Sequence, residues 1–367
     1  MTADAVGGVW SYALELARAL APHGVEVHLA TMGPRPTAAQ RAAAAHVPTL
    51  TLHESEYRLE WMDAPWDDVA RAGDWLLELE RTLRPDVVHL NGYAHGALPW
   101  RAPALVVAHS CVRSWWRAVH GVDAPPAWDR YREAVRVGLA GAAAVVAPTR
   151  AMADALREHY GPVPHARVVP NGRTPLAAPG EKEPLVLTAG RLWDAAKNVR
   201  AAVEASAGQA WTLAVAGDAS PPAGARGGDA CGTGTDATNV RWLGTLPPRE
   251  LGAWMARAAV YALPARYEPF GLSALEAAQA GCALVLGDVP SLREVWGDAA
   301  TYVPPDDVSA LRAAIARLMA DDAGRVTLAR RARRRAADYS PARMADGHLA
   351  AYDAAARAGE REVAACA

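Results

Sequence analysis

The chain has 367 residues, enough for two domains of ordinary size, and 51% of them are hydrophobic. Its 38 basic and 40 acidic side chains give a net charge of −2, which argues against nucleic acid as a partner. No uninterrupted apolar run reaches about 18 residues, so we expect no membrane-spanning helix. The composition is therefore that of a two-domain globular protein.

The cysteines and the N-terminus bear on the cellular compartment. The four cysteines are scattered with no Cys-x-x-Cys spacing, at positions 111, 231, 282 and 366. This pattern argues against a disulfide framework or a zinc site and is typical of a reducing compartment. The N-terminus lacks a basic segment followed by an apolar one, so we expect no secretory signal. We therefore expect a cytoplasmic protein.

The first half of the chain alternates expected strands and helices. A helix is expected to begin at Gly7-Gly8-Val9, because Trp10, Ala13, Leu14, Ala17 and Leu20 recur at helical spacing. Such alternation predicts a parallel sheet covered on both faces. The other elements are expected as strands at residues 25–30, 86–90, 105–108, 142–147 and 167–170, with helices at 75–83 and 130–139.

The second half repeats the pattern after residues 173–184, which are rich in Pro and Ala and are typical of a linker. The Gly-rich segment 218–238 lacks the Gly-Lys-Ser/Thr of a phosphate-binding loop, so we expect a surface loop there. Residues 340–358 are expected to be helical. Six strands are expected, at residues 185–189, 211–216, 239–242, 260–263, 283–286 and 301–303.

The stretch Arg266-Tyr-Glu-Pro-Phe-Gly-Leu-Ser-Ala-Leu-Glu276 is the most informative part of the chain and contains its only Phe, Phe270. Pro269 ends the preceding segment, and Gly271 allows the backbone to approach a ligand closely. A helix is expected from Leu272, and free N–H groups in its first turn are suited to anions. A ligand lying across the start of this helix would contact both Glu268 and Glu276.

This stretch resembles the E-x7-E signature of retaining nucleotide-sugar glycosyltransferases with the GT-B fold, in particular glycosyltransferase family 4. The resemblance continues through residues 277–285 and 287–295. It implies an α/β fold of two Rossmann-like, doubly wound domains facing across a cleft, with the last helix returning to the first domain. The expected domains are residues 1–172 and 173–338, and the returning helix lies in 339–367.

The resemblance also implies a reaction. A sugar moves from a nucleotide donor, a UDP- or GDP-sugar, to an unidentified sugar, lipid or small-molecule acceptor. We expect no metal cofactor, because the chain has no Asp-x-Asp metal signature. A nucleotide-sugar epimerase, a disaccharide phosphorylase and a nucleotide-binding homologue without activity are the alternatives on the same fold.

By the same resemblance, Arg191 and Lys197, in a Gly-Arg-x(5)-Lys arrangement, hold the donor diphosphate. Arg and Lys are suited to this role because the leaving diphosphate gains negative charge as the glycosidic bond breaks. Glu276 accepts hydrogen bonds from the ribose, and Glu268 lies near the donor sugar. The backbone N–H groups of Phe270, Gly271 and Leu272 contact sugar hydroxyls or phosphate.

The first domain is expected to contribute Gly7 and Gly8, whose backbone N–H groups approach the same phosphates, and His109, which ends a strand beside the donor sugar. In the family a buried strand precedes the Gly-Gly loop, whereas only Met-Thr-Ala-Asp-Ala-Val precedes it here. We interpret Met1 as an internal residue of a longer natural chain. The alternative is a sheet that tolerates a short first strand.

Three further features have open interpretations. His89, Asn91 and His95 are expected to line the acceptor side. Two tryptophans in residues 113–120 fit an acceptor platform, a patch touching membrane lipid, or a helix with one buried and one half-exposed Trp. Six arginines in residues 325–335 are typical of a solvated helix face, and a phospholipid-facing surface is the alternative.

Overall fold

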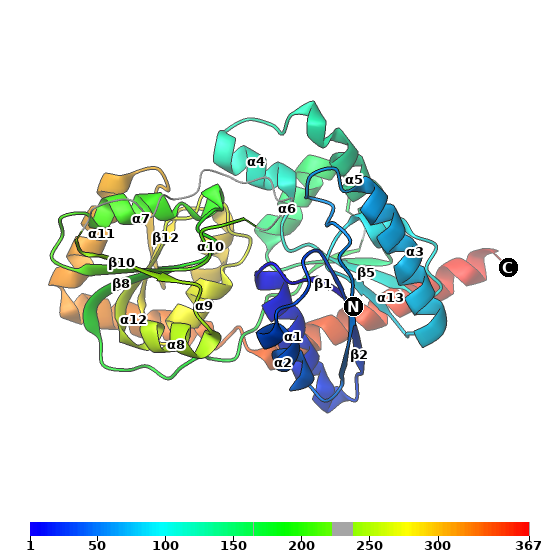
Figure 1. The fold of residues 1–367 in the computed structure, drawn as a ribbon, viewed down its shortest axis with the longest axis horizontal. Helices are drawn as coiled ribbons and strands as arrows, with labels where there is room; N and C mark the ends of the chain where they lie inside the picture. The colour runs from blue at the N-terminus through cyan, green and yellow to red at the C-terminus, as the bar shows by residue number, and fades with distance from the viewer. Residues whose placement is uncertain (164, 222–237, 367) are drawn as a thin grey trace. The chain divides into compact units, whose positions relative to one another are not determined.

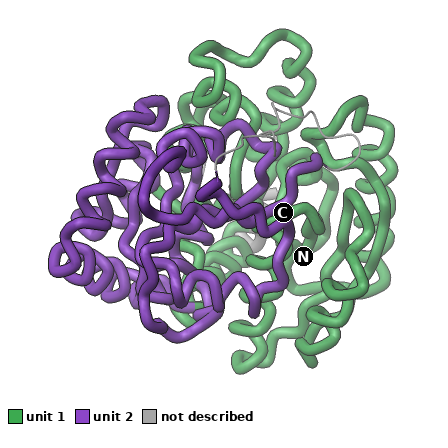
Figure 2. The backbone as a smooth tube through the Cα atoms, turned by 60° about the vertical axis from the view of Figure 1, so that its left-hand side comes forward, with its two compact units in different colours: residues 1–172, 222–226, 341–367 green, residues 173–221, 227–340 purple. Residues whose placement is uncertain are grey.

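The computed structural model describes residues 1–163, 165–221 and 238–366, and it divides them into two compact units (Figure 2). Within the described ranges, unit 1 comprises residues 1–172 and the helix that starts at Pro341, and unit 2 comprises residues 173–221 and 238–340. Most of the Gly-rich segment expected to form a surface loop lies outside the described residues. None of the helices in the described ranges is both long and apolar enough to cross a membrane.

Unit 2 is built on a six-stranded parallel sheet in the order β10-β9-β8-β11-β12-β13. The strand order reverses between β8 and β11, which lie next to each other, so this point is the topological switch of the sheet. The strands are β8 (Glu183–Ala189), β9 (Thr212–Ala216), β10 (Val240–Gly244), β11 (Ala258–Leu263), β12 (Ala283–Gly287) and β13 (Thr301–Val303).

Helices cover both faces of this sheet (Figure 1). Leu185 and Leu187 of β8 belong to one buried cluster and Val186 to the other, because successive strand residues point to opposite faces. The helices are α7 (Val199–Ser206) and α11 (Val308–Ala320) on one face, and α8 (Pro248–Arg257), α9 (Leu272–Gln279), α10 (Pro290–Trp296) and α12 (Asp322–Ala336) on the other.

Unit 1 contains two parallel sheets, one of three strands in the order β1-β2-β3 and one of four in the order β4-β5-β6-β7. They adjoin at β1 and β4, where Asn91 donates hydrogen bonds from its backbone N–H and its side chain to Thr2. The strands are β1 (Thr2–Asp4), β2 (Val27–Met32), β3 (Leu50–Glu54), β4 (Val88–Leu90), β5 (Ala104–Val107), β6 (Ala144–Ala147) and β7 (Ala166–Val168).

The C-terminal helix packs on unit 1, as expected. Buried residues of α1 and α13 share one cluster with Leu105 and Val107 of β5, and the opposite face of the sheet packs on α5 and α6. The helices of unit 1 are α1 (Gly8–Leu20), α2 (Ala38–Ala45), α3 (Trp66–Leu83), α4 (Val112–His120), α5 (Asp129–Gly141), α6 (Arg150–Tyr160) and α13 (Pro341–Cys366).

The predicted α/β fold with parallel sheets in two units is confirmed. The strand before the Gly-Gly loop is present as the three-residue β1, which pairs with β2 over Thr2, Ala3 and Asp4. The sequence reading missed β3 and α2, and it placed the linker two residues too far, because Glu183 and Pro184 already belong to β8. These differences leave the position of the candidate site unchanged.

Candidate active site

The candidate site of unit 2 lies where β8 and β11 end, at the topological switch of the sheet. The loop after β8 carries Arg191 and Lys197, and the loop after β11 carries Glu268. The two loops are joined by a hydrogen bond from the backbone N–H of Arg266 to the Ala196 carbonyl, at 2.8 Å. Open parallel sheets bind ligands at this edge, because loops and helix starts converge there.

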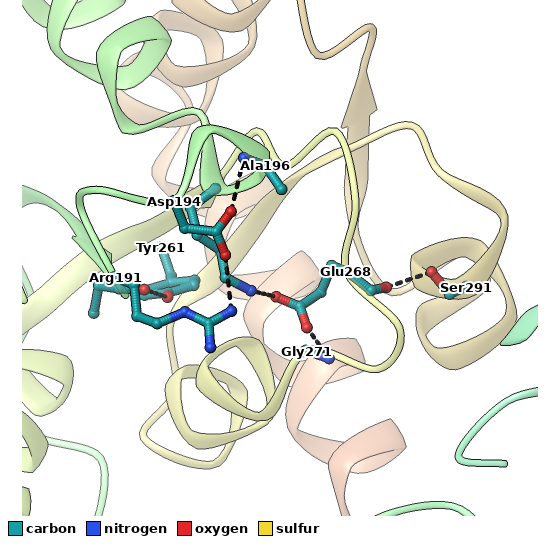
Figure 3. Close-up of polar contacts among 9 residues, drawn as sticks. Arg191, Asp194, Ala196, Tyr261, Glu268, Gly271 and Ser291 are labelled. Atoms are coloured by element: carbon teal, nitrogen blue, oxygen red, sulfur yellow. Dashed lines mark hydrogen bonds and ion pairs between the residues drawn. The ribbon is translucent and has the colours of Figure 1, made fainter. Parts of the chain in front are cut away.

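Lys197 and Glu268 form an ion pair across the two loops, with 2.6 Å between Nζ and Oε2. Only 16% of the Lys197 side chain and 12% of the Glu268 side chain are exposed. The other carboxylate oxygen of Glu268 accepts the backbone N–H of Gly271 at 3.1 Å, and the Glu268 carbonyl accepts the Ser291 hydroxyl (Figure 3). Both carboxylate oxygens are thus engaged, and the side chain is held in one orientation.

Arg191 is more exposed and is bonded on one side only. Its Nη2 donates to Asp194 at 2.8 Å, and Asp194 is held in turn by the backbone N–H of Ala196 (Figure 3). The Nε–H of Arg191 is buried and finds no acceptor among the described residues. Because 40% of the Arg191 side chain is exposed, its positively charged guanidinium is suited to binding an anion.

Glu276 of α9 is engaged by Arg173, a residue that the sequence predicts to lie in the linker. The Nε of Arg173 lies 2.6 Å from Oε1 of Glu276, and both side chains are only 10% exposed. The Arg173 carbonyl accepts the side-chain amide of Gln279 at 2.7 Å, which holds the segment against α9. An Arg in a Pro- and Ala-rich linker gives no sequence signal of such a contact.

The start of α9 is shaped by Gly271, the residue that caps it. Gly271 has φ 92°, in the left-handed region, and an added Cβ would lie 3.1 Å from Cδ2 of Leu292. Both features favour glycine. Phe270 is 2% exposed and its ring packs edge-to-face on Tyr339, with 5.4 Å between ring centroids. Its side chain therefore belongs to the core, and only its backbone is suited to ligand contact.

Gly7 and Gly8 begin α1 in unit 1 and are exposed. Gly7 caps the helix with φ 144°, and no side chain of the described residues caps it by a hydrogen bond. The free N–H groups of a 13-residue helix thus face outward at this end, which is the arrangement expected of an anion site.

His109 follows β5 in unit 1 and is bonded to a residue of the neighbouring strand end. Its Nε2 lies 2.8 Å from Oδ1 of Asn91, and its ring packs edge-on against Tyr12. Burial lowers the pKa of His109 to about 3, with a smaller contribution from His348. His109 is therefore neutral at physiological pH.

The prediction that His89 and His95 line an acceptor surface is wrong. His89 is 2% exposed and bonded to Asn91 and Tyr352, and His95 is 8% exposed with its Nε2 bonded to the Val69 carbonyl. Both are interior residues of unit 1, and His89 lies within the buried strand β4 instead of on a loop.

The two weaker features have mixed outcomes. Trp115 and Trp116 of α4 are both half-buried and cluster with His120, so the reading of one buried and one half-exposed Trp is wrong, and the acceptor platform and lipid patch stay predictions. In α12, Arg325 and Arg335 bind neighbouring backbone carbonyls. That pattern favours a structural role for part of the arginine run.

No group of three or more His, Cys, Asp or Glu side chains that could hold a metal ion occurs among the residues described. The cations at the site are the Arg and Lys side chains named above.

Comparison with known proteins identifies the family. The family model described as Glycosyltransferase Family 4 matches residues 6–175, and the model described as Glycosyl transferases group 1 matches residues 183–321. The glycogen synthase of Mycobacterium tuberculosis is 31% identical over 335 residues, which cover 83% of this chain and 77% of that protein. The chain belongs to glycosyltransferase family 4. The resemblance read from the E-x7-E stretch is confirmed, and the protein is a glycosyltransferase.

Solved structures share the fold of this glycosyltransferase. The sucrose-phosphate synthase of Thermosynechococcus elongatus superimposes with a TM-score of 0.73 at 20% identity, covering 100% of this chain and 99% of that one. Anabaena HepE in complex with UDP and glucose superimposes with a TM-score of 0.68 at 16% identity, covering 94% and 95%. At such identities the likeness establishes the GT-B architecture of the two units.

Proposed function

We propose that this glycosyltransferase moves a sugar from a nucleoside-diphosphate sugar to a sugar, lipid or small-molecule acceptor, with retention of anomeric configuration. One observation carries the proposal. Two cations on the loop after β8, Arg191 and Lys197, lie at the switch point beside the carboxylate of Glu268 and the N-terminal end of α9. This is the part of the sheet where a diphosphate and its sugar are expected to bind.

In this proposal the diphosphate binds Arg191 and Lys197. The guanidinium of Arg191, whose side chain is 40% exposed, donates to a phosphate oxygen, and Lys197 shares its charge between Glu268 and the phosphate. As the glycosidic bond breaks, the leaving group gains charge that these two cations stabilise. The N–H groups at the start of α9, at Phe270 and Leu272, supply further donors, whereas that of Gly271 is bonded to Glu268.

Glu276 is proposed to bind the ribose. Its Oε1 is bonded to Arg173, which fixes the carboxylate in one direction, so that it is suited to accept hydrogen bonds from the ribose hydroxyls. The related HepE structure is a complex with UDP and glucose, so a UDP-sugar is the first donor to test, with a GDP-sugar as the alternative.

Retention is proposed to follow a front-face course, in which a leaving phosphate oxygen takes the proton of the acceptor. Glu268 is an unsuitable nucleophile, because one carboxylate oxygen is bonded to Lys197 and the other to the Gly271 N–H. Both bonds draw electron density from the carboxylate and hold it in place. Glu268 therefore orients Lys197 and the sugar instead of attacking the anomeric carbon.

The test begins with thermal stabilisation of the full chain by a panel of nucleotide sugars, because a bound donor raises the melting temperature by mass action. The donor that stabilises it most is then assayed for nucleoside diphosphate release with and without acceptors, in the presence of EDTA. NMR of the product's anomeric configuration decides between retention and inversion. Inversion of configuration, or turnover abolished by EDTA, would contradict the mechanism.

The same assay separates the alternatives. A disaccharide phosphorylase requires inorganic phosphate and releases sugar phosphate, whereas an epimerase converts its substrate without an acceptor. A homologue without activity binds the nucleotide sugar but produces no nucleoside diphosphate from it. Acceptor-dependent release of nucleoside diphosphate supports the transferase over all three.

A further inference from the structure

Lys197 lies at the end of a single turn of 3₁₀ helix, Ala195–Lys197, in the loop after β8. Such short turns have poorer hydrogen-bond geometry than an α-helix. The ammonium group of a lysine also stands at the end of a flexible four-carbon stem. Its direction is therefore fixed only where the backbone that carries it is held by other parts of the fold.

Asn198, the next residue, has a left-handed backbone and a side-chain amide with two acceptors. Its φ of 53° lies in a region where Asn is one of the few non-glycine residues that occur. The residue is 4% exposed, and its Nδ2 donates to the Pro264 carbonyl at 3.0 Å and to the Pro305 carbonyl at 2.6 Å. Glycine would suit the backbone alone, whereas asparagine suits the backbone and supplies two donors.

The two carbonyls belong to two other loops at the same edge of the sheet. Pro264 directly follows β11 and begins the loop that carries Glu268, and Pro305 lies in the loop after β13. The carboxyl ends of parallel strands meet at this edge, where ligands bind. The side chain of Asn198 thus joins the loop of the cation to the loop of the carboxylate and to a third loop.

The residues before Lys197 are held in the same way. The backbone N–H of Arg266 donates to the Ala196 carbonyl at 2.8 Å, and its Nη1 donates to the Ala195 carbonyl at 3.0 Å. Arg266 therefore fixes the backbone on one side of Lys197, and Asn198 fixes it on the other.

We propose that Asn198 is a positioning residue for Lys197, which it holds beside Glu268 at the place where the leaving diphosphate binds. The inference rests on the proposed function, because it takes Lys197 as a cation that binds the diphosphate. It adds that the amide of Asn198, and not its backbone conformation alone, is required for the charge of Lys197 to act on the leaving group.

Two substitutions of Asn198 test this role in turnover. Asn198→Gly retains the left-handed backbone and leaves space for a water molecule at the two carbonyls, and Asn198→Asp keeps the shape but has no donor when ionised. We expect each to lower kcat/KM about ten- to hundredfold, because a slightly misplaced group stabilises the transition state poorly. Wild-type turnover in folded Asn198→Gly would overturn the proposal.

Asn239 provides a matched control in the same unit. It directly precedes β10, and its Nδ2 donates to the carbonyls of Ser206 at 2.7 Å and Trp211 at 2.9 Å, at the opposite edge of the sheet. Asn239→Gly therefore removes the same kind of contact away from the site, so we expect turnover to stay at the wild-type value. If it lowers kcat/KM as much as Asn198→Gly does, general destabilisation explains both and the proposal is wrong.

A double-mutant cycle with Lys197→Ala separates positioning from a structural role. A residue that acts through Lys197 has nothing to position when the lysine is absent. We therefore expect Asn198→Gly to lower kcat/KM much less in the Lys197→Ala background than in the wild type. An equal factor of loss in the two backgrounds would overturn the proposal.

The chain has only two lysines, Lys182 and Lys197, so NMR of the full chain with 13C,15N-labelled lysine gives a direct readout without substrate. Lys197 is assigned from the signal lost in Lys197→Arg, and Glu268→Gln shows where the signal lies when the ion pair is broken. We expect Asn198→Gly to move the Lys197 signal toward that position. The signal of Lys182, which binds the Ala280 carbonyl at 2.8 Å, should stay in place. An unmoved Lys197 signal would contradict the positioning role.

A second NMR measurement needs no variant of Asn198. Both protons of its Nδ2 are bonded and the residue is buried, so they should exchange slowly with water in the wild type. Fast exchange would overturn the proposal even if neither variant folds.

The proposed function and the positioning role fail separately. If the wild type turns over no nucleotide sugar, the proposed function is wrong, and the two NMR measurements on the free protein still decide whether Asn198 positions Lys197.

Discussion

The two units handle polar groups at their candidate sites in opposite ways. Unit 2 uses ions in pairs that are half-buried or more, as in Lys197 with Glu268 and Arg173 with Glu276. Unit 1 uses neutral groups in a buried network, in which burial lowers the pKa of His348 to about 4 and that of His109 to about 3. A charged side chain that is paired with one of opposite charge can be partly buried and stay charged. Where buried histidines face only neutral groups, burial removes their charge.

The largest expected effect comes from breaking the most buried ion pair. Arg173→Ala removes the cation that binds Oε1 of Glu276, at a site where each side chain is 10% exposed. We expect unit 2 to lose about 3–5 kcal/mol of unfolding free energy, because breaking a buried ion pair by removing one partner is costly. Denaturant unfolding of the variant measures the loss.

A paired substitution separates this stability effect from nucleotide binding. Arg173→Met with Glu276→Leu replaces both ions by apolar groups, so stability should return toward that of the wild type. Nucleoside diphosphate affinity by calorimetry should nonetheless stay about 1.5–3 kcal/mol weaker, because the ribose loses a charged acceptor. Full affinity in the double variant would remove Glu276 from the site.

Lys197→Ala tests whether the ion pair of unit 2 contributes to turnover. Its loss removes a cation from the leaving group, so we expect kcat/KM to fall about 10²–10³-fold. The matched control is Arg257→Ala, which breaks the exposed pair with Glu183 at the opposite end of β8, and turnover should stay at the wild-type value. Equal losses in the two variants would show that general destabilisation, and not the site, is responsible.

Acid pH should act on the neutral network of unit 1. His348 has a pKa of about 4 when folded and about 6.5 when unfolded, so the unfolded chain binds more protons between these values. The stability that the neutral His348 contributes is therefore fully present above about pH 6.5. It is lost as the pH falls, and at pH 5 the loss from this one group is about 2 kcal/mol.

His348→Gln isolates this contribution. Glutamine does not ionise, so the variant should lose about 2 kcal/mol less than the wild type between pH 7 and pH 5 in denaturant unfolding. The other groups of unit 1, including Glu60, whose pKa is raised by burial, are common to both proteins and cancel in the difference. Identical pH dependence would mean that folding does not lower the pKa of His348.

The sequence predicts elements that depend on local residue patterns. It misses contacts that form only when distant parts of the chain fold together. The sequence correctly predicts β8, β11 and the turn that opens α9. Apolar strand runs and helix starts are local properties, so they can be recognised from the residues alone. The strand β3 was missed because Leu50–Glu54 mixes Leu with Thr, His and Glu and is half-exposed.

The missed site partners lie far from the residues that they bind. Arg173 and Glu276 are 103 positions apart, and Tyr12 and His348 are 336 apart. No periodicity or spacing connects such pairs, since the sheet topology alone brings them together. The family resemblance implies that Glu276 accepts hydrogen bonds from a ribose, and the fold shows that one of its partners is Arg173.

The smallest expected effect concerns the only Phe of the chain. Phe270→Leu keeps an apolar side chain in the core but removes the edge-to-face contact with Tyr339, so unit 2 should lose about 1 kcal/mol. Tyr339→Phe is the control that keeps the ring contact and removes only the hydroxyl bond to the Val295 carbonyl. A double-mutant cycle with Tyr339→Leu measures the ring pair itself. If the two substitutions are additive, Phe270 is held by general packing, and its rarity in this sequence has no bearing on the turn that opens α9.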